Sequence, residues 1–553
     1  MRFATPSQSV QSHDRTVFHR AGILAPSLAM IASLSWILSS YSHPQNASPE
    51  SHYSRGMELV RKGQLQEALN ELKRAAELRP RDPRTHNMIG AVLTQLGRLE
   101  EADAAYLQAL AVAPEFLPAR KNRAVNAFTQ RNFDLARKEF EALEPLTPND
   151  FVPPLFLGLI SLENLNFEDA VKHLSMANRL SPSNPKILIP LTRVNFILGK
   201  RDSALQLAGS AEASLQTDPE RYELAVLLAQ FEANTQAEGL FRGLKQRQPD
   251  SYDVNFNLAL VEYRLGKYSH ALQAINDFET RQKLSGEFQN LQGWILNKMG
   301  RWEHAQRSLE KAIELEPDNP DHYLDLSTAL RNAGDIEKAM QVVLQGLQQC
   351  TERERLELQL GLLYQKMGKS GEAEKRFRAV LDRTPSNRSA YLALANLMAS
   401  TERQAEALDL LKKGVEKVPS DALLRYTFGG LLLDAGQTEK AEVELKRALE
   451  LNPLYANTHY LLGKLYLERG DLTASRTSFE KACGFNPGHV RAYYQLSLIA
   501  RRQGNTQKAR EYSEIVQKLN QQVHKKDEDN LLGTVDESLQ EGSPTGTRGH
   551  LKR

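Results

Sequence analysis

Every mark from which the fold is predicted occurs within one 34-residue stretch, residues 422–455, which reads ALLRYTFGGLLLDAGQTEKAEVELKRALELNPLY. Apolar residues recur in it at intervals of three and four, as at Leu445, Ala448 and Leu449, a spacing typical of amphipathic helix. Gly436 stands where a first helix ends in a left-handed residue, and Pro453 stops a second helix. The stretch therefore predicts two helices joined by a tight turn.

The same marks return every 34 residues along most of the chain. Prolines occur at 80, 114, 148 and 182, and again at 249, 317, 385, 419, 453 and 487. The period predicts fourteen units, which begin at residues 49, 83, 117, 151, 185, 218, 252, 286, 320, 354, 388, 422, 456 and 490 and end near Gln522. A repeated pair of helices therefore replaces the three or four separate domains that the length of 553 residues would suggest.

Two columns of small residues run through the units. The twentieth position is alanine in thirteen of the fourteen units and Ser475 in the other. The eighth position is mostly glycine, alanine or serine, for example Gly429, and ten units carry glycine at the fifteenth position. Small side chains allow helix axes to approach to the short end of the usual range of about 8–10 Å, so each unit is predicted to be two closely packed helices.

The complete pattern resembles the tetratricopeptide repeat: a small residue at position 8, glycine at 15, alanine at 20, an aromatic residue or leucine at 24, and proline at 32. The aromatic residues at position 24 are Tyr106, Phe140, Phe241, Phe377 and Phe479. The resemblance implies an all-α fold, a right-handed superhelical α-solenoid in which the first helices of successive repeats line a concave groove. Each repeat is expected to be stabilised mainly by its neighbours.

Two repeats depart from the pattern. Repeat 5 has Thr192 at the eighth position, Pro190 inside its first helix and no terminal proline, and repeat 6 has Glu232 in place of the turn glycine. The array is therefore divided into repeats 1–4 (residues 49–184), divergent repeats 5–6 (185–251) and repeats 7–14 (252–522). Two interpretations of the divergent pair stay open: simple sequence drift, or a weak seam between the flanking repeats.

The first residues carry an export signature. Residues 1–20 are polar and contain three arginines, and no charged side chain follows from residue 21 through residue 49. A helix over residues 21–38 would be about 27 Å long, marginal for the hydrocarbon core of about 30 Å. Residues 21–42 are predicted to be this N-terminal hydrophobic helix, either a cleaved signal peptide or a single transmembrane anchor; a helix buried in a cytosolic domain is the alternative. The remaining chain is expected to be extracytoplasmic, whether periplasmic, secreted or held by the anchor.

Residues 523–553 form a polar stretch without sustained periodicity. This composition predicts a disordered tail, and a short segment that docks on a partner is the alternative.

The sequence offers little that points to catalysis. It contains no P-loop, dinucleotide fingerprint, HExxH, CxxC or GxSxG motif, and the repeats leave no stretch long enough for a catalytic domain. His52 and His86 share the fourth position of adjacent repeats, but that position normally packs and no third ligand is evident, so no metal or other cofactor is expected. Cys350 and Cys483 are expected to be buried small hydrophobes. The net charge of only +2 argues against a dedicated nucleic-acid binder.

The candidate binding residues lie near the ends and in the middle of the first helices. The twelfth and thirteenth positions of repeats 7–10 carry four cations, Arg264, Lys298, Arg331 and Lys366, which predict a basic stripe along the groove. The alternative is that each cation only offsets the dipole of its own helix. The fifth position adds aromatic residues suited to binding a peptide or a sugar, and some of them are expected to be core: Tyr53, Tyr222, Phe256, Tyr426, Tyr460 and Tyr494.

We therefore expect a non-enzymatic scaffold that binds a segment of another protein in the concave groove. The alternative is an envelope or exopolysaccharide assembly or secretion factor that contacts glycan or a secretion complex. A third reading, a regulatory subunit of a catalytic partner, predicts the same sequence features as the first. Binding measured at low and high salt distinguishes the first two readings, because binding of an acidic peptide by the basic stripe weakens in high salt, whereas binding of glycan should persist.

Overall fold

The computed structural model describes residues 48–522, and every regular element within that range is helical. Twenty-seven of these elements are α-helices with the bounds that follow. They are α2 (Pro49–Arg61), α3 (Leu65–Leu78), α4 (Pro83–Gln95), α5 (Leu99–Val112), α6 (Leu117–Thr129), α7 (Phe133–Leu143), α8 (Val152–Glu163), α9 (Phe167–Leu180), α10 (Pro185–Ile197), α11 (Arg201–Ser214), α12 (Asp218–Gln230), α13 (Asn234–Arg247), α14 (Tyr252–Arg264), α15 (Tyr268–Glu279), α16 (Gly286–Lys298), α17 (Trp302–Leu315), α18 (Pro320–Asn332), α19 (Ile336–Gln349), α20 (Glu354–Lys366), α21 (Ser370–Arg383), α22 (Arg388–Ser400), α23 (Gln404–Lys417), α24 (Ala422–Asp434), α25 (Thr438–Leu451), α26 (Ala456–Glu468), α27 (Leu472–Phe485) and α28 (Val490–Arg502). A short 3-10 helix, η3 (Glu144–Leu146), follows α7, and residues 506–522 are also helical.

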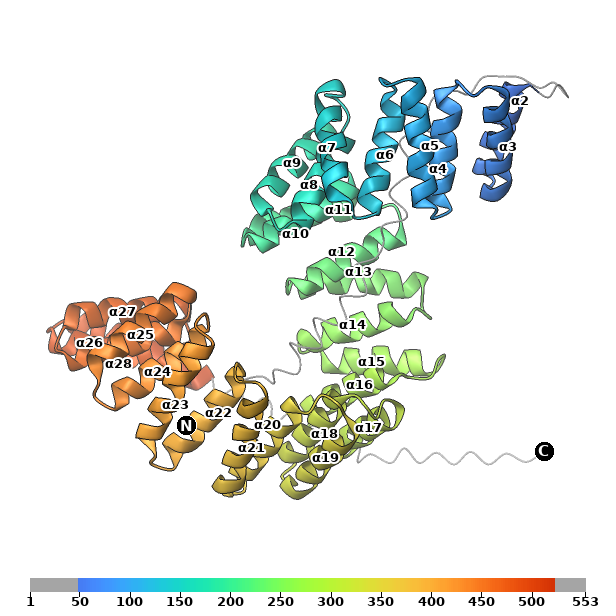
Figure 1. The fold of residues 1–553 in the computed structure, drawn as a ribbon. Helices are drawn as coiled ribbons and strands as arrows, with labels where there is room; N and C mark the ends of the chain where they lie inside the picture. Colours follow the sequence, from blue (N-terminus) through green and yellow to red (C-terminus); the bar gives the residue numbers. More distant parts are fainter. Residues whose placement is uncertain (1–47, 523–553) are drawn as a thin grey trace, which may run out of the picture. The chain divides into compact units, whose positions relative to one another are not determined.

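The helices form the predicted pairs (Figure 1). Each even-numbered helix begins at the first residue of a predicted unit, except that α8 begins at Val152, one residue late. Polar side chains fix several of these starts by accepting a backbone hydrogen bond from the first turn, as Asp421 does from the N–H of Leu424 at 2.8 Å. The prediction of about fourteen helix-turn-helix repeats in an all-α solenoid is confirmed.

The chain divides into two compact units, residues 1–281 and 282–553, of which residues 48–281 and 282–522 are described. In each unit the two helices of a repeat pack against each other, and the second helix packs against the first helix of the next repeat. Consecutive first helices also contact each other, for example α4 with α6 in the first unit and α18 with α20 in the second. We call the surface formed by positions 5, 9, 12 and 13 of these first helices the first-helix face, because that spacing places them on one side of a helix.

The small columns mark the places where side chains of the two helices meet. All thirteen alanines at the twentieth position are buried, and so is Ser475, whose hydroxyl donates to the carbonyl of Gly463 at 2.8 Å. The residue at position 24 lies directly over the eighth position. A Cβ atom at Gly90 would lie 2.5 Å from the ring of Tyr106, and one at Gly429 would lie 2.7 Å from Cγ of Leu445. The eighth position is therefore small because the large residue at position 24 fills the space above it.

The residue at the fifteenth position has a left-handed backbone conformation in all fourteen repeats. Ten repeats place glycine there with φ between 71° and 92°, as at Gly334. The other four place an ordinary residue there at φ of 58–61°: Arg131, Leu165, Glu232 and Glu402. The turn between the two helices thus imposes this conformation even where no glycine relieves the strain.

The departures in repeats 5 and 6 are accommodated locally. Helix α10 runs through Pro190 without ending. Thr192 is fully buried, its hydroxyl donates to the carbonyl of Leu188 at 2.7 Å, and the residue at position 24 of the same repeat is the small Ala208. Glu232 takes the left-handed turn conformation, and a capping box formed by Thr217 and Glu220 starts α12. The weak seam at residues 185–251 stays a prediction.

The predictions for residues 1–20, for the hydrophobic helix at 21–42 and for the tail at 523–553 lie outside the described residues. Within residues 48–522, none of the helices is both long enough and apolar enough to span a bilayer.

Candidate partner-binding face

Three of the four predicted cations form a row in the second unit. Lys298, Arg331 and Lys366 occupy the last turns of α16, α18 and α20, and these helices contact each other in that order. Lys298 and Lys366 are exposed, whereas Arg331 is half-buried. We call these three residues the basic row.

The basic row has no acidic partner within residues 48–522. None of its side chains forms an ion pair there, and the residues beside them in the last turns are the uncharged Asn297, Asn332 and Gln365. Burial lowers the pKa of Arg331, because partial loss of hydration disfavours the charged guanidinium. The favourable interaction of a cation with the end of its own helix accounts for the position of these residues but leaves their side chains available.

Arg264, the fourth predicted cation, lies in the first unit and has a structural contact. Its Nη1 donates to the carbonyl of Ala229, in the last turn of α12, at 3.0 Å. Burial lowers the pKa of Arg264 to about 10. The guanidinium therefore ties the end of one first helix to the end of the preceding one, a role that the sequence pattern does not distinguish from that of a binding residue.

The fifth-position aromatics of the first unit are held within the protein. The ring of Tyr222 packs edge-on against Phe241 with centroids 6.0 Å apart, and its hydroxyl accepts a hydrogen bond from the amide of Asn257 at 3.0 Å. Burial raises the pKa of Tyr222 to about 12. Phe256 is buried and stacks on Tyr252 with centroids 6.0 Å apart. The expectation that some of these aromatics are core applies to Phe256.

The fifth-position tyrosines of the second unit are more accessible. Tyr426 on α24 and Tyr460 on α26 are half-buried, and Tyr494 on α28 is 52% exposed. Burial raises the pKa of Tyr426 to about 12. Together with the basic row, these three tyrosines give the second unit most of the predicted binding residues on its first-helix face.

Hydrogen bonds between adjacent first helices were missed from the sequence. Among the described residues, three pairs show a hydrogen bond from position 5 to position 6 of the next repeat, 35 residues later. The pairs are Asn87 with Asn122 at 2.9 Å, Tyr222 with Asn257 at 3.0 Å, and Asn290 with Asp325 at 3.1 Å. A search for polar residues 35 apart would have found them, because the repeat length plus one places them side by side.

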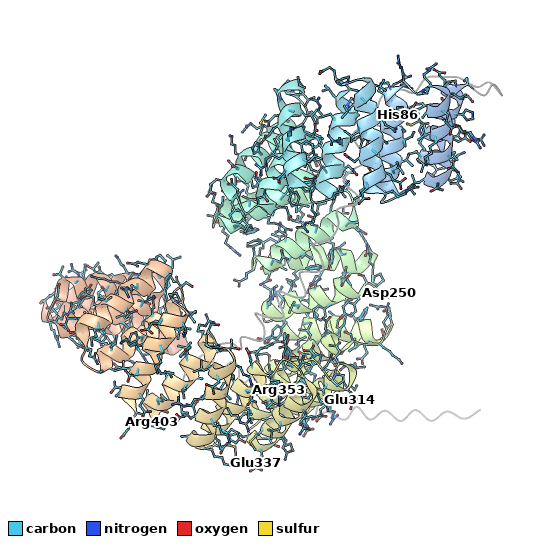
Figure 2. The ribbon with its side chains drawn as sticks, in the orientation of Figure 1. His86, Asp250, Glu314, Glu337, Arg353 and Arg403 are labelled. Atoms are coloured by element: carbon cyan, nitrogen blue, oxygen red, sulfur yellow. The ribbon has the colours of Figure 1, made fainter. Side chains whose placement is uncertain are left out.

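The two histidines considered for a metal site have other partners. His52 Nδ1 lies 2.6 Å from a carboxylate oxygen of Glu71. His86, labelled in Figure 2, directs Nε2 at the carbonyl of Pro80 at 2.7 Å. Among the residues that the structure describes, no three side chains of His, Cys, Asp or Glu are grouped so that they could hold a metal ion.

Both cysteines are buried, as predicted, and neither forms a disulfide. Burial raises the pKa of the Cys350 thiol and raises that of Cys483 to about 12, so neither is a reactive thiolate at neutral pH.

Comparisons with known proteins find relatives over parts of the chain. A TPR repeat-containing protein of Pseudomonas aeruginosa is 36% identical over 121 residues, which cover 22% of this chain and 20% of that protein. Human protein O-mannosyl-transferase TMTC3 is 24% identical over 325 residues, which cover 55% of this chain and 34% of that protein. The chain thus spans 20% of the length of the first relative and 34% of that of the second. The crystal structure of MamA matches with 25% identity and a TM-score of 0.28 over 30% of this chain and 97% of MamA.

Models of one repeat family match along both described units. Those described as tetratricopeptide repeat match residues 83–116, 296–356, 358–422, 426–489 and 490–522, and one described as TPR repeat matches residues 56–97. These matches cover half of the chain, and two of them, at residues 83–116 and 490–522, begin where the first helices α4 and α28 begin. In every repeat the residues at positions 8 and 20 are buried, and the residue at position 15 has a left-handed backbone conformation. Together with the family matches, these features show that the chain belongs to the tetratricopeptide-repeat family.

Proposed function

We propose that the chain is a non-catalytic scaffold that binds an acidic segment of another protein along the first-helix face of residues 282–522. Repeats of this family bind other proteins, and the observation that carries the finer proposal is the basic row. Lys298, Arg331 and Lys366 come from three successive repeats, and the first helices that carry them contact each other. None of the three has an acidic partner within the described residues.

The physical argument concerns Arg331 above all. Its side chain has lost part of its hydration without gaining a carboxylate, so a partner carboxylate would restore a favourable environment for the charge. Lys298 and Lys366 are exposed, and an exposed ion pair contributes only about 0.2–1 kcal/mol. Affinity would therefore come from several modest contacts, and it would fall as salt screens them.

We further propose that the repeats act outside the cytoplasm, released after export or anchored at the membrane. The support is the sequence of residues 1–49, in which arginines precede an uncharged apolar stretch. Protease accessibility in intact and permeabilised cells of the native host tests this location. Digestion of the repeats only after permeabilisation of the cytoplasmic membrane would contradict it.

The test of the binding proposal compares three forms of the full-length chain in pull-downs from the native host. The first is the wild type, and the second is the Lys298→Glu, Arg331→Glu, Lys366→Glu variant. The third is a matched reversal on second helices, Lys311→Glu, Lys375→Glu, Lys412→Glu, whose lysines are exposed on α17, α21 and α23. A partner retained by the wild type and by the second-helix variant, but lost by the first-helix variant, is the expected result.

The identified partner is then titrated at low and high salt. Equal capture by both variants, or a partner affinity that does not change with salt, would show that the basic row is not the binding site. Because Arg331 is half-buried, circular dichroism of each variant checks folding, and a version with Arg331→Gln replaces the triple reversal if that variant is unfolded.

A further inference from the structure

The last repeat carries a concentration of unpaired cations. Residues 490–522 form α28 and the helix at 506–522, which we call the terminal helix, and they contain six Lys and Arg but only two Glu. All six cationic side chains are exposed, and none of them forms an ion pair within residues 48–522. They are Arg491, Arg501, Arg502, Lys508, Arg510 and Lys518.

Two of these cations line a pocket beside the terminal helix. The pocket has a volume of about 460 Å³. Hydroxyl and amide side chains supply further donors next to the two guanidinium groups, and a single carboxylate opposes them. The lining includes Arg501, Arg510, Thr506, Ser513, Gln517 and Glu514. A ligand that carries several carboxylates suits this set of donors better than a neutral or cationic one.

The outer side of the terminal helix is polar where the preceding repeats are apolar. Position 28 of repeats 8–13 carries a buried or half-buried apolar residue in each case: Ile313, Leu347, Leu381, Val415, Leu449 and Cys483. In repeat 14 this position is the exposed Gln517. A further repeat, or a second copy stacked end to end in the same way, would bury this polar side chain against an apolar helix, so a polar ligand is the better occupant.

An acidic segment of the same chain follows the terminal helix closely. Residues 527–541 contain six Asp and Glu and no Lys or Arg. Asp527 is only five residues beyond residue 522, the last residue that the structure describes. We propose that residues 527–541 bind to the basic end of their own molecule, with carboxylates of the segment at the guanidinium groups of Arg501 and Arg510.

The segment is long enough to reach both arginines. At 1.5 Å per residue the terminal helix is about 25 Å long. An extended chain spans about 3.3 Å per residue, so the fourteen residues from 523 to Asp536 cover about 46 Å. Asp536 and Glu537 can therefore return along the whole helix as far as Thr506, at its start.

Tethering makes weak ion pairs sufficient for this contact. An exposed ion pair is weak by itself, and salt screens it. A segment joined by a few residues is present at an effective concentration on the order of 1 mM, so a contact with a dissociation constant of about 1 mM would be occupied about half of the time.

The contact differs from the one in the proposed function. The basic row lies on repeats 8–10 and contributes none of the six cations of repeat 14. The bound segment would keep an acidic partner away from repeat 14 and leave the basic row open to it. The proposal therefore does not depend on the proposed function.

The experiment measures the distance between two spin labels in the full-length chain by pulsed electron paramagnetic resonance. The labels are attached to Gln503→Cys, at an exposed turn residue just before the terminal helix, and to Ser538→Cys in the segment. The native Cys350 and Cys483 are buried, which directs labelling to the introduced cysteines.

Two charge reversals are compared in this labelled chain. The test variant adds Arg501→Glu and Arg510→Glu. The control variant adds Arg353→Glu and Arg383→Glu instead, because these arginines are also exposed in the second unit and have no ion pair within residues 48–522. Circular dichroism of each variant checks folding. If the test variant is unfolded, Asp536→Asn with Glu537→Gln replaces it.

We expect a narrow distance distribution below about 25 Å for the labelled chain and for the control variant in low salt, because the segment then lies beside the start of the terminal helix. The test variant should give a broad distribution centred near about 35 Å, the value for an unbound chain that leaves the far end of the helix. Salt at about 1 M should shift the labelled chain in the same direction. Replacement of all six acidic residues of the segment by lysine should restore the short distance in the test variant.

A broad distribution in the labelled chain, or equal distributions in the test and control variants, would overturn the proposal. Dilution with an excess of unlabelled protein separates a contact within one molecule from a contact between copies. Loss of the short distance on dilution would assign the basic end to the segment of a second copy and contradict the proposal. The charge reversal of Lys298, Arg331 and Lys366 should leave the distance unchanged, so the two proposals can fail separately.

Discussion

Gly463 lies directly beneath the ring of Phe479, so that a Cβ atom at residue 463 would lie 2.6 Å from Cε1 of that ring. Phe479 is fully buried and cannot move aside freely. The contact joins the eighth and twenty-fourth positions of one repeat.

Gly463→Ala is therefore expected to destabilise the second unit by about 1–3 kcal/mol through overpacking. Urea unfolding followed by far-UV circular dichroism measures the change. Gly484→Ala, in the second helix of the same repeat, is the control, because a Cβ atom there meets nothing within 4 Å. That variant should gain about 0.5–1 kcal/mol, and an equal loss in both would refute the packing argument.

Leu165→Gly should stabilise the protein, although it removes a large side chain. Leu165 is held at φ 59° and is 72% exposed, so glycine relieves backbone strain and gives up little burial. The greater freedom of glycine in the unfolded chain offsets part of this gain, which leaves about 0.5 kcal/mol. Leu454→Gly is the matched control, a turn leucine that is 67% exposed without positive φ, and it should lower the urea midpoint. A lower midpoint for Leu165→Gly would contradict the prediction.

His489 should make the stability of the last repeat depend on pH. Its Nδ1 accepts a hydrogen bond from the N–H of Ala492 at 3.2 Å, which requires a neutral ring, and burial lowers its pKa from 6.5. The unfolded chain therefore binds the proton more readily. The stabilisation is complete above about pH 6.5 and is lost as the pH falls through the folded pKa.

The measurement for His489 is the urea midpoint at pH 7.5 and at pH 5. His489→Asn keeps an N-capping side chain that does not titrate, so its midpoint should fall less between the two values. The same fall in both proteins would mean that His489 is not the group responsible.

Glu442 should contribute in a lower pH range. Its carboxylate accepts from Lys446 at 2.8 Å, from Arg469 and from the Tyr466 hydroxyl at 3.1 Å, and these bonds lower its pKa to about 2. Because the folded pKa lies below the unfolded value, the stabilisation is present above about pH 4.5 and is lost as the pH falls toward 2.

At about 1.4 kcal/mol per pKa unit, the contribution of Glu442 is no more than about 3 kcal/mol. Glu442→Gln should lower stability at pH 7 and flatten the acid dependence between pH 4.5 and 2, whereas Glu450→Gln, at an exposed site on the same helix, should do neither. Identical acid profiles for Glu442→Gln and the wild type would contradict this.

Arg264 and Lys298 should respond differently to the same substitution. Arg264→Met removes the hydrogen bond to the Ala229 carbonyl and should cost about 1–2 kcal/mol, whereas Lys298→Met changes an exposed side chain and should cost less than about 0.5 kcal/mol. Urea unfolding of both variants measures the difference. Equal costs would mean that the Arg264 contact is not structural.

The starts of the repeats could be predicted to within one residue because each depends on local marks that recur at a fixed period, such as Gly436 and Pro453. The left-handed conformation of Leu165 and Glu232 was hidden because their side chains do not favour it; only their place in the period reveals it.

The contacts and exposure of each side chain were harder to predict, because they depend on the residues of the neighbouring repeat. Arg264 and Lys298 occupy the same position of adjacent repeats, yet Arg264 meets a carbonyl 35 residues earlier and Lys298 is exposed. Phe256 and Tyr494 also share one position, but the first is buried and the second is half open to solvent. Periodicity gives the face of the helix on which a residue lies and not the groups that it meets there.

Each helix packs mainly against helices of its own and adjacent repeats, and this affects how the protein folds while it is being synthesised. Contacts of this kind are close in sequence, which gives a low contact order and favours rapid folding. A repeat that leaves the ribosome finds its packing surface on the repeat synthesised just before it, so folding can keep pace with translation from the N-terminal end. A truncated chain that ends after any complete repeat should then keep the structure of the repeats before it.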